Sequence, residues 1–527
     1  MKQRTARVSR VIAGLLSIVS VAGGVIAGCS SSPPAPVTST FSGSAKPAGS
    51  WPYPNGDLAN TRDAAGSQIT SANVTSLREA WTFMLTGTAA TGVSYAGSFA
   101  AAPVVVNGVV YIQDLYANVY AISLGTGKLL WEYTLNTAEK TGPGPDGVAV
   151  ADGVVYGTSP SAVFALNAAT GKVIWNDTSL LSSGQGTFEI QPQVSGGRVY
   201  VASAYGSGPG GGVLFGLNAS TGAVLWRFNS VVGGQPAGVT ALGVGSGGAW
   251  ETPLVGTDGS VTFGIGNPYQ SIGQAIDHPA RDLYTDSEVN LDAATGKLRW
   301  YYQAVPNDFK DWDMQLSPIS ADVNGVPAVI GGGKMGDVYA MNAATGALLW
   351  KTPVGVHNGT DNDSLLLLEH KLTIKLPYTF EPGALGGILT DMAVADGSVY
   401  VATINLALKS TTMSSVNGNA AGPGGESGEI EALSLATGKV EWATKVPTLP
   451  LGATTVSNDL VFTTLYNGTL IALNRTTGAI VYQHKLPTTT NSPIAIAGNT
   501  VIVPTGGPES SAKGGGGNPQ LVAYTVS

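Results

Sequence analysis

The chain has 527 residues, a length that fits either several small domains or one large all-β domain. It contains 72 glycines and 30 prolines, and only 11% of its residues are charged, against about 25% in a typical globular protein. This composition favours many short strands joined by tight turns. A formal net charge of −8 supplies no basic surface for phosphates, so nucleic acid is excluded as a partner.

The N-terminus has the features of an export signal. Basic residues from Lys2 to Arg10 precede an apolar run from Val11 to Ala27, and the next residues are Gly28 and Cys29. This junction resembles a bacterial lipobox, and Cys29 is the chain's single cysteine. We therefore predict a lipoprotein signal peptide at 1–28, lipidation of Cys29 and a flexible tether at 29–50. The alternatives are an ordinary signal peptide with a chance cysteine, or a short membrane anchor.

A short repeat dominates the rest of the sequence. A strand-like run ends in Thr-Gly, and an aromatic residue follows four positions after the glycine. Seven pairs fit this pattern: Gly127/Trp131, Gly171/Trp175, Gly222/Trp226, Gly296/Trp300, Gly346/Trp350, Gly438/Trp442 and Gly478/Tyr482. Glycine supplies the positive φ that a tight hairpin needs, so each copy predicts one blade of antiparallel strands. The aromatic residues are interpreted as structural contacts between neighbouring blades.

An eighth blade is indicated by two strand-like runs near the C-terminus, Thr500–Pro504 and Gln520–Tyr524, which lack the Thr-Gly-aromatic ending. The segment Leu77–Phe83, which carries Trp81, is able to supply the missing outer strand. The fold class is therefore all-β: residues 51–527 are predicted to form an eight-bladed β-propeller whose ring is closed by the N-terminal segment.

The Thr-Gly-Lys-x-x-Trp repeat resembles that of the pyrroloquinoline-quinone (PQQ) dependent alcohol dehydrogenases, the quinoproteins. The run Trp51–Arg62 is similar to the opening motif of that family, and Asn73–Trp81 matches it as well. The resemblance covers essentially the whole chain after the tether. It implies a PQQ-type propeller with an active centre on the ring axis.

The resemblance also implies roles for individual residues. Gly264–Pro268 resembles a Gly-x-Gly-Asn-Pro turn whose asparagine, here Asn267, binds a metal ion. Trp300–Asp313 aligns with the family's catalytic stretch, which makes Asp311 the catalytic base and a metal ligand. Asp313 corresponds to the additional acid that some members use for a larger metal ion. Lys334 falls where the family places a cation over the quinone oxygens. The implied cofactors are PQQ and Ca²⁺ or a lanthanide.

Several positions depart from the family pattern. No acidic residue lies between Ile190 and Trp250, where the family has a metal-binding glutamate, and the first-blade glutamate is replaced within Phe99–Pro103. The adjacent cysteine pair of many members is absent, and Asn307 and Lys310 replace histidine and tryptophan. Trp250 is a candidate for the aromatic floor beneath the cofactor, or a core residue, because its register is displaced by about one position.

Two functions follow from these residues. The first is an exported oxidoreductase, lipid-anchored at the outer face of the cell membrane, that oxidises a small alcohol and passes electrons to an acceptor. The second is a non-catalytic propeller lipoprotein that acts as a binding or envelope-assembly scaffold for a protein partner. The fold does not discriminate between them, because function resides in the site. Convergence of Asn267, Asp311, Asp313 and Lys334 on the central channel favours the first.

Overall fold

A computed structural model describes residues 49–85, 99–135, 144, 146–204, 211–231, 247–414, 419–420, 427–506 and 519–526. All of them belong to one compact unit. The proposed signal peptide, Cys29 and nearly all of the tether lie outside the described residues. Within the described ranges no helix is both long and apolar enough to cross a bilayer.

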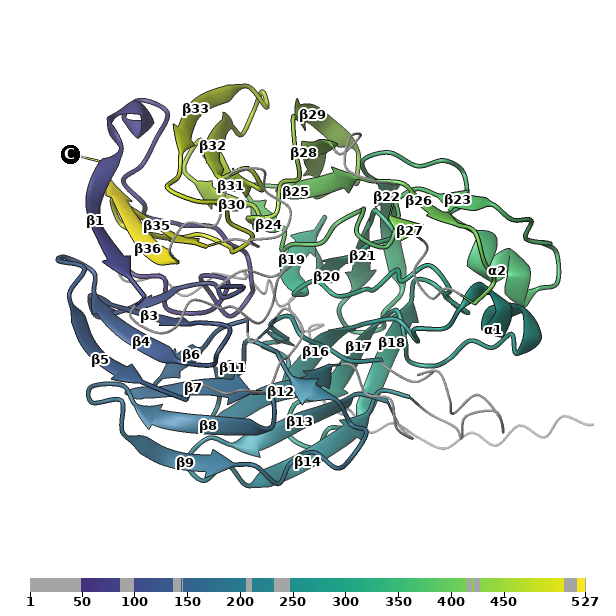
Figure 1. The fold of residues 1–527 in the computed structure, drawn as a ribbon, viewed down its shortest axis with the longest axis horizontal. Helices are drawn as coiled ribbons and strands as arrows, with labels where there is room; N and C mark the ends of the chain where they lie inside the picture. Colours follow the sequence, from purple (N-terminus) through teal and green to yellow (C-terminus); the bar gives the residue numbers. More distant parts are fainter. Residues whose placement is uncertain are drawn as a thin grey trace, which may run out of the picture. The chain divides into compact units, whose positions relative to one another are not determined.

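Eight antiparallel sheets follow one another around a common axis (Figure 1). In most of them the paired strands follow chain order; in blade 8 the outer strand is β1, and in blade 3 both β10 and β11 pair with β12. Blade 1 contains β2 (Val104–Val106), β3 (Val109–Gln113), β4 (Val119–Ser123) and β5 (Leu129–Tyr133). Blade 2 contains β6 (Ala149–Ala151), β7 (Val154–Ser159), β8 (Ala162–Asn167) and β9 (Val173–Asp177). Blade 3 contains β10 (Thr187–Phe188), β11 (Gln193–Ser195), β12 (Arg198–Ala204), β13 (Val213–Asn218) and β14 (Val224–Asn229). Blade 4 contains β15 (Leu254–Val255), β16 (Ser260–Ile265), β17 (Ser287–Asp292) and β18 (Leu298–Gln303).

The second half of the ring repeats the pattern. Blade 5 contains β19 (Ile319–Val323), β20 (Val326–Gly332), β21 (Asp337–Asn342) and β22 (Leu348–Pro353). Blade 6 contains β24 (Ala393–Ala395), β25 (Ser398–Asn405), β28 (Ser427–Ser434) and β29 (Val440–Val446). Blade 7 contains β30 (Thr455–Ser457), β31 (Leu460–Leu465), β32 (Thr469–Asn474) and β33 (Ile480–Lys485). Blade 8 contains β34 (Ala495–Ala497), β35 (Thr500–Thr505), β36 (Gln520–Thr525) and β1 (Arg78–Met84).

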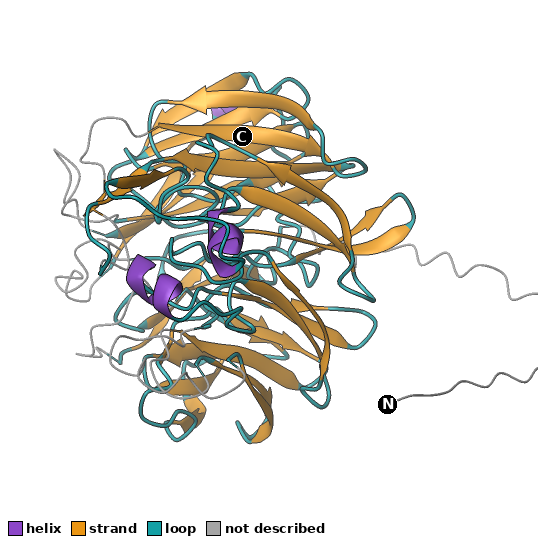
Figure 2. Ribbon diagram, turned by 90° about the vertical axis from the view of Figure 1, so that its right-hand side faces the viewer, coloured by secondary structure: helices purple, strands orange, loops and turns teal. Residues whose placement is uncertain are grey.

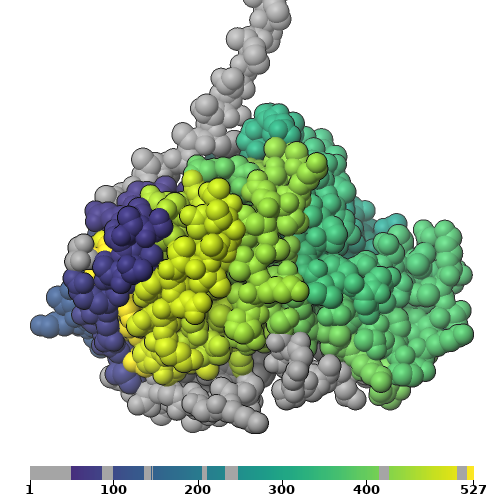
Figure 3. Space-filling model, turned by 90° about the horizontal axis from the view of Figure 1, so that it is seen from above, coloured from purple at the N-terminus to yellow at the C-terminus, as the bar shows by residue number. Residues whose placement is uncertain are grey.

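Blade 8 confirms the predicted closure. Strand β1 pairs antiparallel with β36, with Arg78 opposite Thr525 and Met84 opposite Gln520. In Figure 3 the purple N-terminal residues accordingly pack beside the yellow C-terminal ones. The N-terminal strand thus covers the edge that β36 would otherwise expose, which is how a ring of sheets removes an aggregation-prone edge.

The Thr-Gly repeat explains how neighbouring blades lock together. The indole nitrogen of Trp131 donates to the carbonyl of Ala168 at 2.9 Å, and its ring packs on Gly171 of the next blade. Gly171 has φ +68, and a Cβ there would lie 2.6 Å from that ring. Glycine is therefore required for both conformation and space. The same indole-to-carbonyl bond is made by Trp81, Trp175, Trp226, Trp300, Trp350 and Trp442.

An insertion between blades 5 and 6 projects from the ring and contains helix α2 (Asp363–Leu368) and β23 (Tyr378–Phe380). Strand β23 forms a small sheet with β26 (Leu408–Ser410) and β27 (Asn419–Ala420), which lie between β25 and β28 of blade 6. Helix α2 lies beside α1 (Ile272–Asp277), which follows β16 in blade 4 (Figures 1 and 2). A single 3-10 turn, η1 (Val74–Ser76), precedes β1. The insertion matters because it contacts the loop that carries Asp311.

Candidate functional site

The candidate site is a cavity of about 450 Å³. Its walls come from loops between blades, from loops within blades 4 and 5, and from the N-terminal segment. The lining residues are Asn55, Ala100, Ala102, Asp146, Gln191, Trp250, Glu251, Tyr269, Asp311, Gln315, Lys334, Leu385, Leu389, Thr390, Asp391, Leu451, Asn491 and Pro493. Three of the predicted site residues, Trp250, Asp311 and Lys334, are among them.

An N-terminal strap, residues 51–64, crosses the ring beside this cavity. Trp51 bridges to Val105 in the innermost strand of blade 1, and Asp63 bridges to Val456 in the innermost strand of blade 7. Between them, the amide of Asn60 donates to the carbonyls of Thr252 and Pro318, which precede blades 4 and 5. The strap therefore ties together inner strands and loops that are far apart in the sequence.

Four predicted residues meet in one hydrogen-bonded group. The side-chain amide of Asn267 donates to Asp311 and, at 2.7 Å, to Asp313. The Nζ atom of Lys334 lies 3.3 Å from Asp311 and 2.5 Å from Asp313. The chain supplies Asn267 after β16, the two aspartates after β18 and Lys334 after β20. The expected convergence of these residues is thus present.

The loop that carries Asp311 is held by its own side chains. The carboxylate of Asp308 accepts the backbone N–H groups of Lys310 and Trp312, at 3.0 and 2.9 Å. Asp311 itself has φ 65, a left-handed conformation that few non-glycine residues adopt. The indole of Trp312 donates to the carbonyl of Pro382 in the insertion, at 3.0 Å. These contacts fix the backbone on both sides of Asp311.

Lys310, which stands where the family has tryptophan, joins this loop to the insertion. Its side chain is fully buried, with Nζ 3.9 Å from the centre of the Trp312 ring and bonded to the carbonyl of Thr360. Burial lowers the pKa of Lys310 to about 8. The aromatic contact compensates in part for the lost hydration of the ammonium group.

Burial also shifts the pKa values of Asp311 and Lys334, two charged side chains in this hydrogen-bonded group. It raises the pKa of Asp311 to about 8; Lys334 opposes this rise, and Asp313 and Asp308 add to it. Burial would lower the pKa of Lys334, but Asp311 and Asp313 outweigh it and raise that pKa. Lys334 therefore stays charged, whereas Asp311 is largely protonated at neutral pH.

Asp286 adds a buried acid that sequence inspection missed. Both of its carboxylate oxygens are buried without a hydrogen-bond partner among the described residues. Burial, and then the charges of Asp308 and Asp313, raise its pKa well above the usual range. A neutral carboxylic acid close to Asp311 and Asp313 is the consequence.

Three acids of the cavity wall were also missed. Asp146, Glu251 and Asp391 precede the innermost strands of blades 2, 4 and 6, respectively. Each is an isolated acid with no motif around it. The only signal was position, because each lies just before the first strand of a predicted blade.

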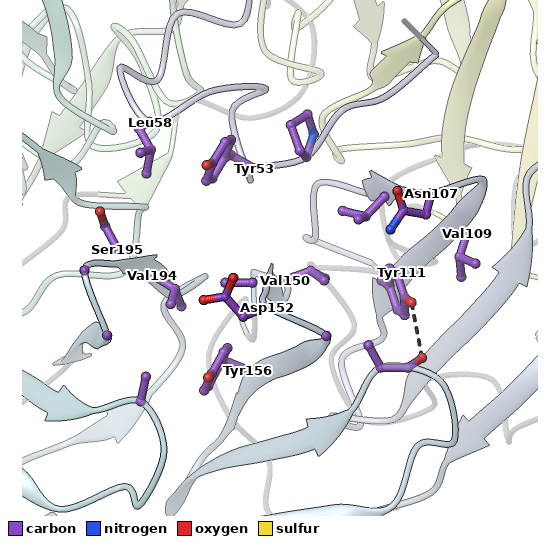
Figure 4. Close-up of a pocket in the computed structure, with 18 residues that line it drawn as sticks. Tyr53, Leu58, Asn107, Val109, Tyr111, Val150, Asp152, Tyr156, Val194 and Ser195 are labelled. Carbon is purple, nitrogen blue, oxygen red and sulfur yellow. Dashed lines mark hydrogen bonds between the residues drawn. The ribbon is translucent and has the colours of Figure 1, made fainter. Parts of the chain in front are cut away.

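A second pocket, of about 500 Å³, lies between the strap and the turns of blades 1 to 3. In Figure 4, Asp152 lies between Tyr53 and Tyr156. Asp152 occupies a hairpin turn with φ 49, and Tyr156 packs against Trp175 of its own blade. Tyr111 likewise packs against Trp131, and its hydroxyl donates to Ala168. The blade structure accounts for these residues, so the axial cavity remains the candidate site.

Comparison with known families identifies the fold's relatives. Residues 51–151 and 184–355 match the family model described as PQQ, glucose/ethanol/alcohol dehydrogenase, beta-propeller domain, and make up slightly more than half of the chain. The chain belongs to this family. Residues 426–524 of this quinoprotein-family chain also match a model described as outer membrane protein assembly factor BamB.

Individual relatives are similar to different extents. A quinohemoprotein alcohol dehydrogenase of Comamonas testosteroni is 30% identical over 305 residues, which cover 52% of this chain and 41% of that protein. A putative dehydrogenase, XoxF, of Paracoccus denitrificans is 26% identical over 542 residues, covering 87% and 85%. For the first seven curated relatives, the match spans only 41% to 50% of their length.

Solved structures share the fold. The structure of the Comamonas testosteroni enzyme superposes with a TM-score of 0.76 at 22% identity, covering 90% of this chain and 80% of that one. A europium-containing methanol dehydrogenase superposes with a TM-score of 0.74 at 20% identity, covering 91% and 99%. The predicted eight-bladed propeller of the PQQ type is confirmed.

The residues of the site fit a hard cation. Carboxylate and amide oxygens are the donors such ions take, and Oδ2 of Asp313 is fully buried with only the ammonium of Lys334 beside it. The described residues hold no group of three His, Cys, Asp or Glu side chains placed for a metal. A cation held here would take only part of its shell of about six to eight ligands from these residues, and other oxygens would have to complete it.

The cavity also fits a flat quinone in part. The ring of Trp250 packs directly on the Gly266 turn, where a Cβ would lie 2.6 Å from the ring and 2.7 Å from Oδ1 of Asp313. An aromatic surface thus adjoins Asp313 and its partners. PQQ is a tricarboxylate, and Asp146 and Glu251 in the cavity wall would repel it unless they are protonated or paired with a cationic group. Without such a group burial favours protonation, since it raises the pKa of both acids.

Proposed function

We propose that this protein oxidises an alcohol in the axial cavity, using PQQ and a hard cation. The observation that carries the proposal is the convergence of Asn267, Asp311, Asp313 and Lys334 beside Trp250, from loops of different blades. A decayed site would not be expected to keep these four side chains in mutual contact. Membership of the alcohol dehydrogenase propeller family supports the same chemistry.

Asp311 is the base in this proposal. Its carboxylate lines the cavity and takes the hydroxyl proton of the alcohol. The carbinol carbon then loses a hydride, and the alcohol becomes a carbonyl compound. PQQ bound in the cavity would accept that hydride, and a cation held by Asn267, Asp311 and Asp313 would polarise the quinone. Lys334 provides a fixed positive charge at the same place, while Asp308 holds the loop in position.

The raised pKa of Asp311 sets a condition for this role. A carboxyl group with a pKa of about 8 is mostly protonated at neutral pH and cannot accept the alcohol's proton. A cation bound next to Asp311 would lower this pKa, because it would favour the charged form. Asp311 would then be ionised and able to accept the proton.

The test is reconstitution of the purified full chain with PQQ and either Ca²⁺ or a lanthanide. Binding is followed by PQQ absorbance and fluorescence, and turnover by alcohol-dependent reduction of a dye. We expect Asp311→Asn to abolish turnover and to retain the fold. Asp152→Asn removes a distant carboxylate at a turn that asparagine tolerates, and serves as the control. Turnover that survives Asp311→Asn contradicts the assignment of the base.

We further propose that the protein is exported and held at the outer face of the cell membrane by a lipid on Cys29. Support comes from the sequence alone, since Cys29 lies outside the described residues. Cys29→Ala should move the protein from the membrane fraction to the soluble fraction and abolish labelling with a fatty-acid probe. Retention of Cys29→Ala at the membrane would favour an uncleaved anchor.

A scaffold function is the second candidate, favoured by the match of residues 426–524 to an outer membrane assembly factor. It predicts that a protein partner co-purifies after cross-linking and that PQQ does not bind. PQQ binding that depends on Lys334 separates the two functions, because a scaffold has no need of this lysine.

A further inference from the structure

Two carboxylates of the axial cavity have no side-chain partner among the described residues. Asp146 and Glu251 both line it, and neither side chain makes a hydrogen bond or an ion pair within the described part of the chain. Their neighbour Asp391 differs, because its two oxygens accept the backbone N–H and the hydroxyl of Ser317, both at 2.9 Å. The cavity therefore contains two acids whose hydrogen-bonding capacity is unused.

The nearby basic groups do not neutralise these acids by contact. The ammonium of Lys334 is bound to Asp311 and Asp313. The guanidinium of Arg62 donates to Asn55, Thr455 and two backbone carbonyls, none of which is a carboxylate. The charge of Arg62 acts on Glu251 only at a distance, where it lowers the pKa of that acid, so no basic side chain of the described residues contacts Asp146 or Glu251. A cationic ligand would supply the positive charge in contact with them.

Two buried glutamines point to the same kind of ligand. Gln315 and Gln191 line the cavity and are 6% and 4% exposed. The amide nitrogen of Gln315 donates to the carbonyl of Leu389, and that of Gln191 donates to the carbonyls of Ala102 and Val148. Only a nitrogen can face those carbonyls, so the orientation of both amides is fixed. Their oxygens remain as acceptors with no partner in the described residues.

The unsatisfied groups of the cavity are thus acceptors, and two of them carry negative charge when ionised. A ligand that satisfies them brings several hydrogen-bond donors and a positive charge. Burial and the charge of Asp391 raise the pKa of Glu251 well above its usual range, although the charge of Arg62 opposes this rise. A primary ammonium group, with three N–H donors, meets each requirement.

We propose that the cavity selects alcohols that carry a protonated primary amine, and that Asp146 and Glu251 bind the ammonium group. The claim that such an amine is a substrate rests on the proposed alcohol oxidation. The claim that it binds rests on the cavity alone. Asp146 and Glu251 are specificity residues in this proposal, and Gln315 contributes an acceptor. Their use would leave Asp311 free to act on the hydroxyl.

The test compares ethanolamine with n-propanol, in which a methyl group replaces the ammonium. Binding of each to the purified full chain is measured by calorimetry under two conditions: in metal-free buffer, and in the same buffer after addition of PQQ and Ca²⁺. We expect ethanolamine to bind at least about tenfold more tightly than n-propanol. In the double variant Asp146→Asn with Glu251→Gln, we expect that advantage to be lost and n-propanol binding to be unchanged. Asp152→Asn, which removes one carboxylate from the other pocket, should leave both affinities unchanged.

The outcomes separate this inference from the proposed function. Equal binding of ethanolamine and n-propanol overturns it, and so does an ethanolamine advantage that survives the double variant. Failure of PQQ-dependent turnover, with the charge-dependent binding intact, overturns the alcohol oxidation and leaves the amine site standing. Circular dichroism and thermal unfolding of the double variant check the fold. Glu251→Gln alone, which retains shape, supplies a second variant if the double one is unstable.

Discussion

Lys334 places its ammonium 2.5 Å from Oδ2 of Asp313, a carboxylate that is fully buried. The same ammonium lies 3.3 Å from Asp311, so one lysine serves two acids. A cation bound to both carboxylates would occupy much the same electrostatic position. The lysine and a bound metal ion would therefore be coupled. Each would lower the cost of burying negative charge on these two acids, so each would weaken the need for the other.

Removal of Lys334 should expose this coupling. We expect Lys334→Met to lower the free energy of unfolding by about 3–5 kcal/mol, because it leaves two buried acids without a counter-charge. Ca²⁺ or a lanthanide should then raise the melting temperature of the variant more than that of the wild type. Thermal unfolding with and without the ion measures both effects. Lys371→Met breaks an exposed pair with Glu369 and is the control, with an expected loss below about 1 kcal/mol.

The blade contacts can be tested with two glycines of the same backbone conformation. Gly171 has φ +68 and touches the ring of Trp131, whereas Gly153 has φ +77 with open space around its Cβ position. Alanine at either site pays the conformational cost of positive φ, about 1 kcal/mol. Gly171→Ala must also displace the indole, so we expect a further loss of about 1–3 kcal/mol. Equal losses in urea denaturation would show that the indole contact contributes nothing.

The fold was predictable because the repeat encodes contacts between consecutive blades. Thr-Gly fixes the hairpin, and tryptophan reaches the hairpin of the next blade, so the two parts of one local motif specify a neighbour. Closure by β1 followed from a missing outer strand. Asn267, Asp311, Asp313 and Lys334 were identified because each lies in a short motif of the family. Their mutual contacts are consistent with the roles predicted for them.

The acids of the cavity wall were not predictable in the same way. Asp146, Glu251 and Asp391 come from three loops separated by more than a hundred residues, and no spacing links them. The burial that perturbs them is a property of the closed ring. Lys310 was seen only as a departure from tryptophan. Its role became clear from a contact with Thr360 in an insertion that has no counterpart in the repeat.

Glu431 makes the stability of blade 6 depend on pH. Burial raises its pKa to about 7, although the N–H of Gly355 and the hydroxyl of Thr403 lower it. The folded state therefore holds a proton that the unfolded chain has released. The associated stability is present below the unfolded pKa and is lost as pH rises through about 7. In Glu431→Gln, the decline in unfolding free energy between about pH 5 and about pH 8 should be smaller by up to about 3 kcal/mol. Identical pH profiles for variant and wild type would contradict this.

Arg62 should be the residue on which the strap depends most. It is fully buried, and its guanidinium donates to Asn55 within the strap at 2.7 Å and to Thr455 of blade 7 at 2.8 Å. It also donates to the backbone carbonyls of Thr454 and Ile494. Arg62→Met leaves four buried acceptors unsatisfied, so we expect a loss of about 3–5 kcal/mol in unfolding free energy.

The part of the chain that Arg62→Met destabilises is as informative as the total loss of unfolding free energy. Each blade keeps its own ladder of hydrogen bonds, whereas the strap is held by single side chains such as Asn60 and Arg62. In Arg62→Met, hydrogen exchange should therefore accelerate in residues 51–64 and in the cavity loops well before it does in the blade strands. Arg78→Met, an exposed change on β1, should leave the exchange of the strap unaltered. Uniform acceleration across all blades would mean that the strap and the ring unfold as one unit, and that the axial cavity cannot open by release of the strap alone.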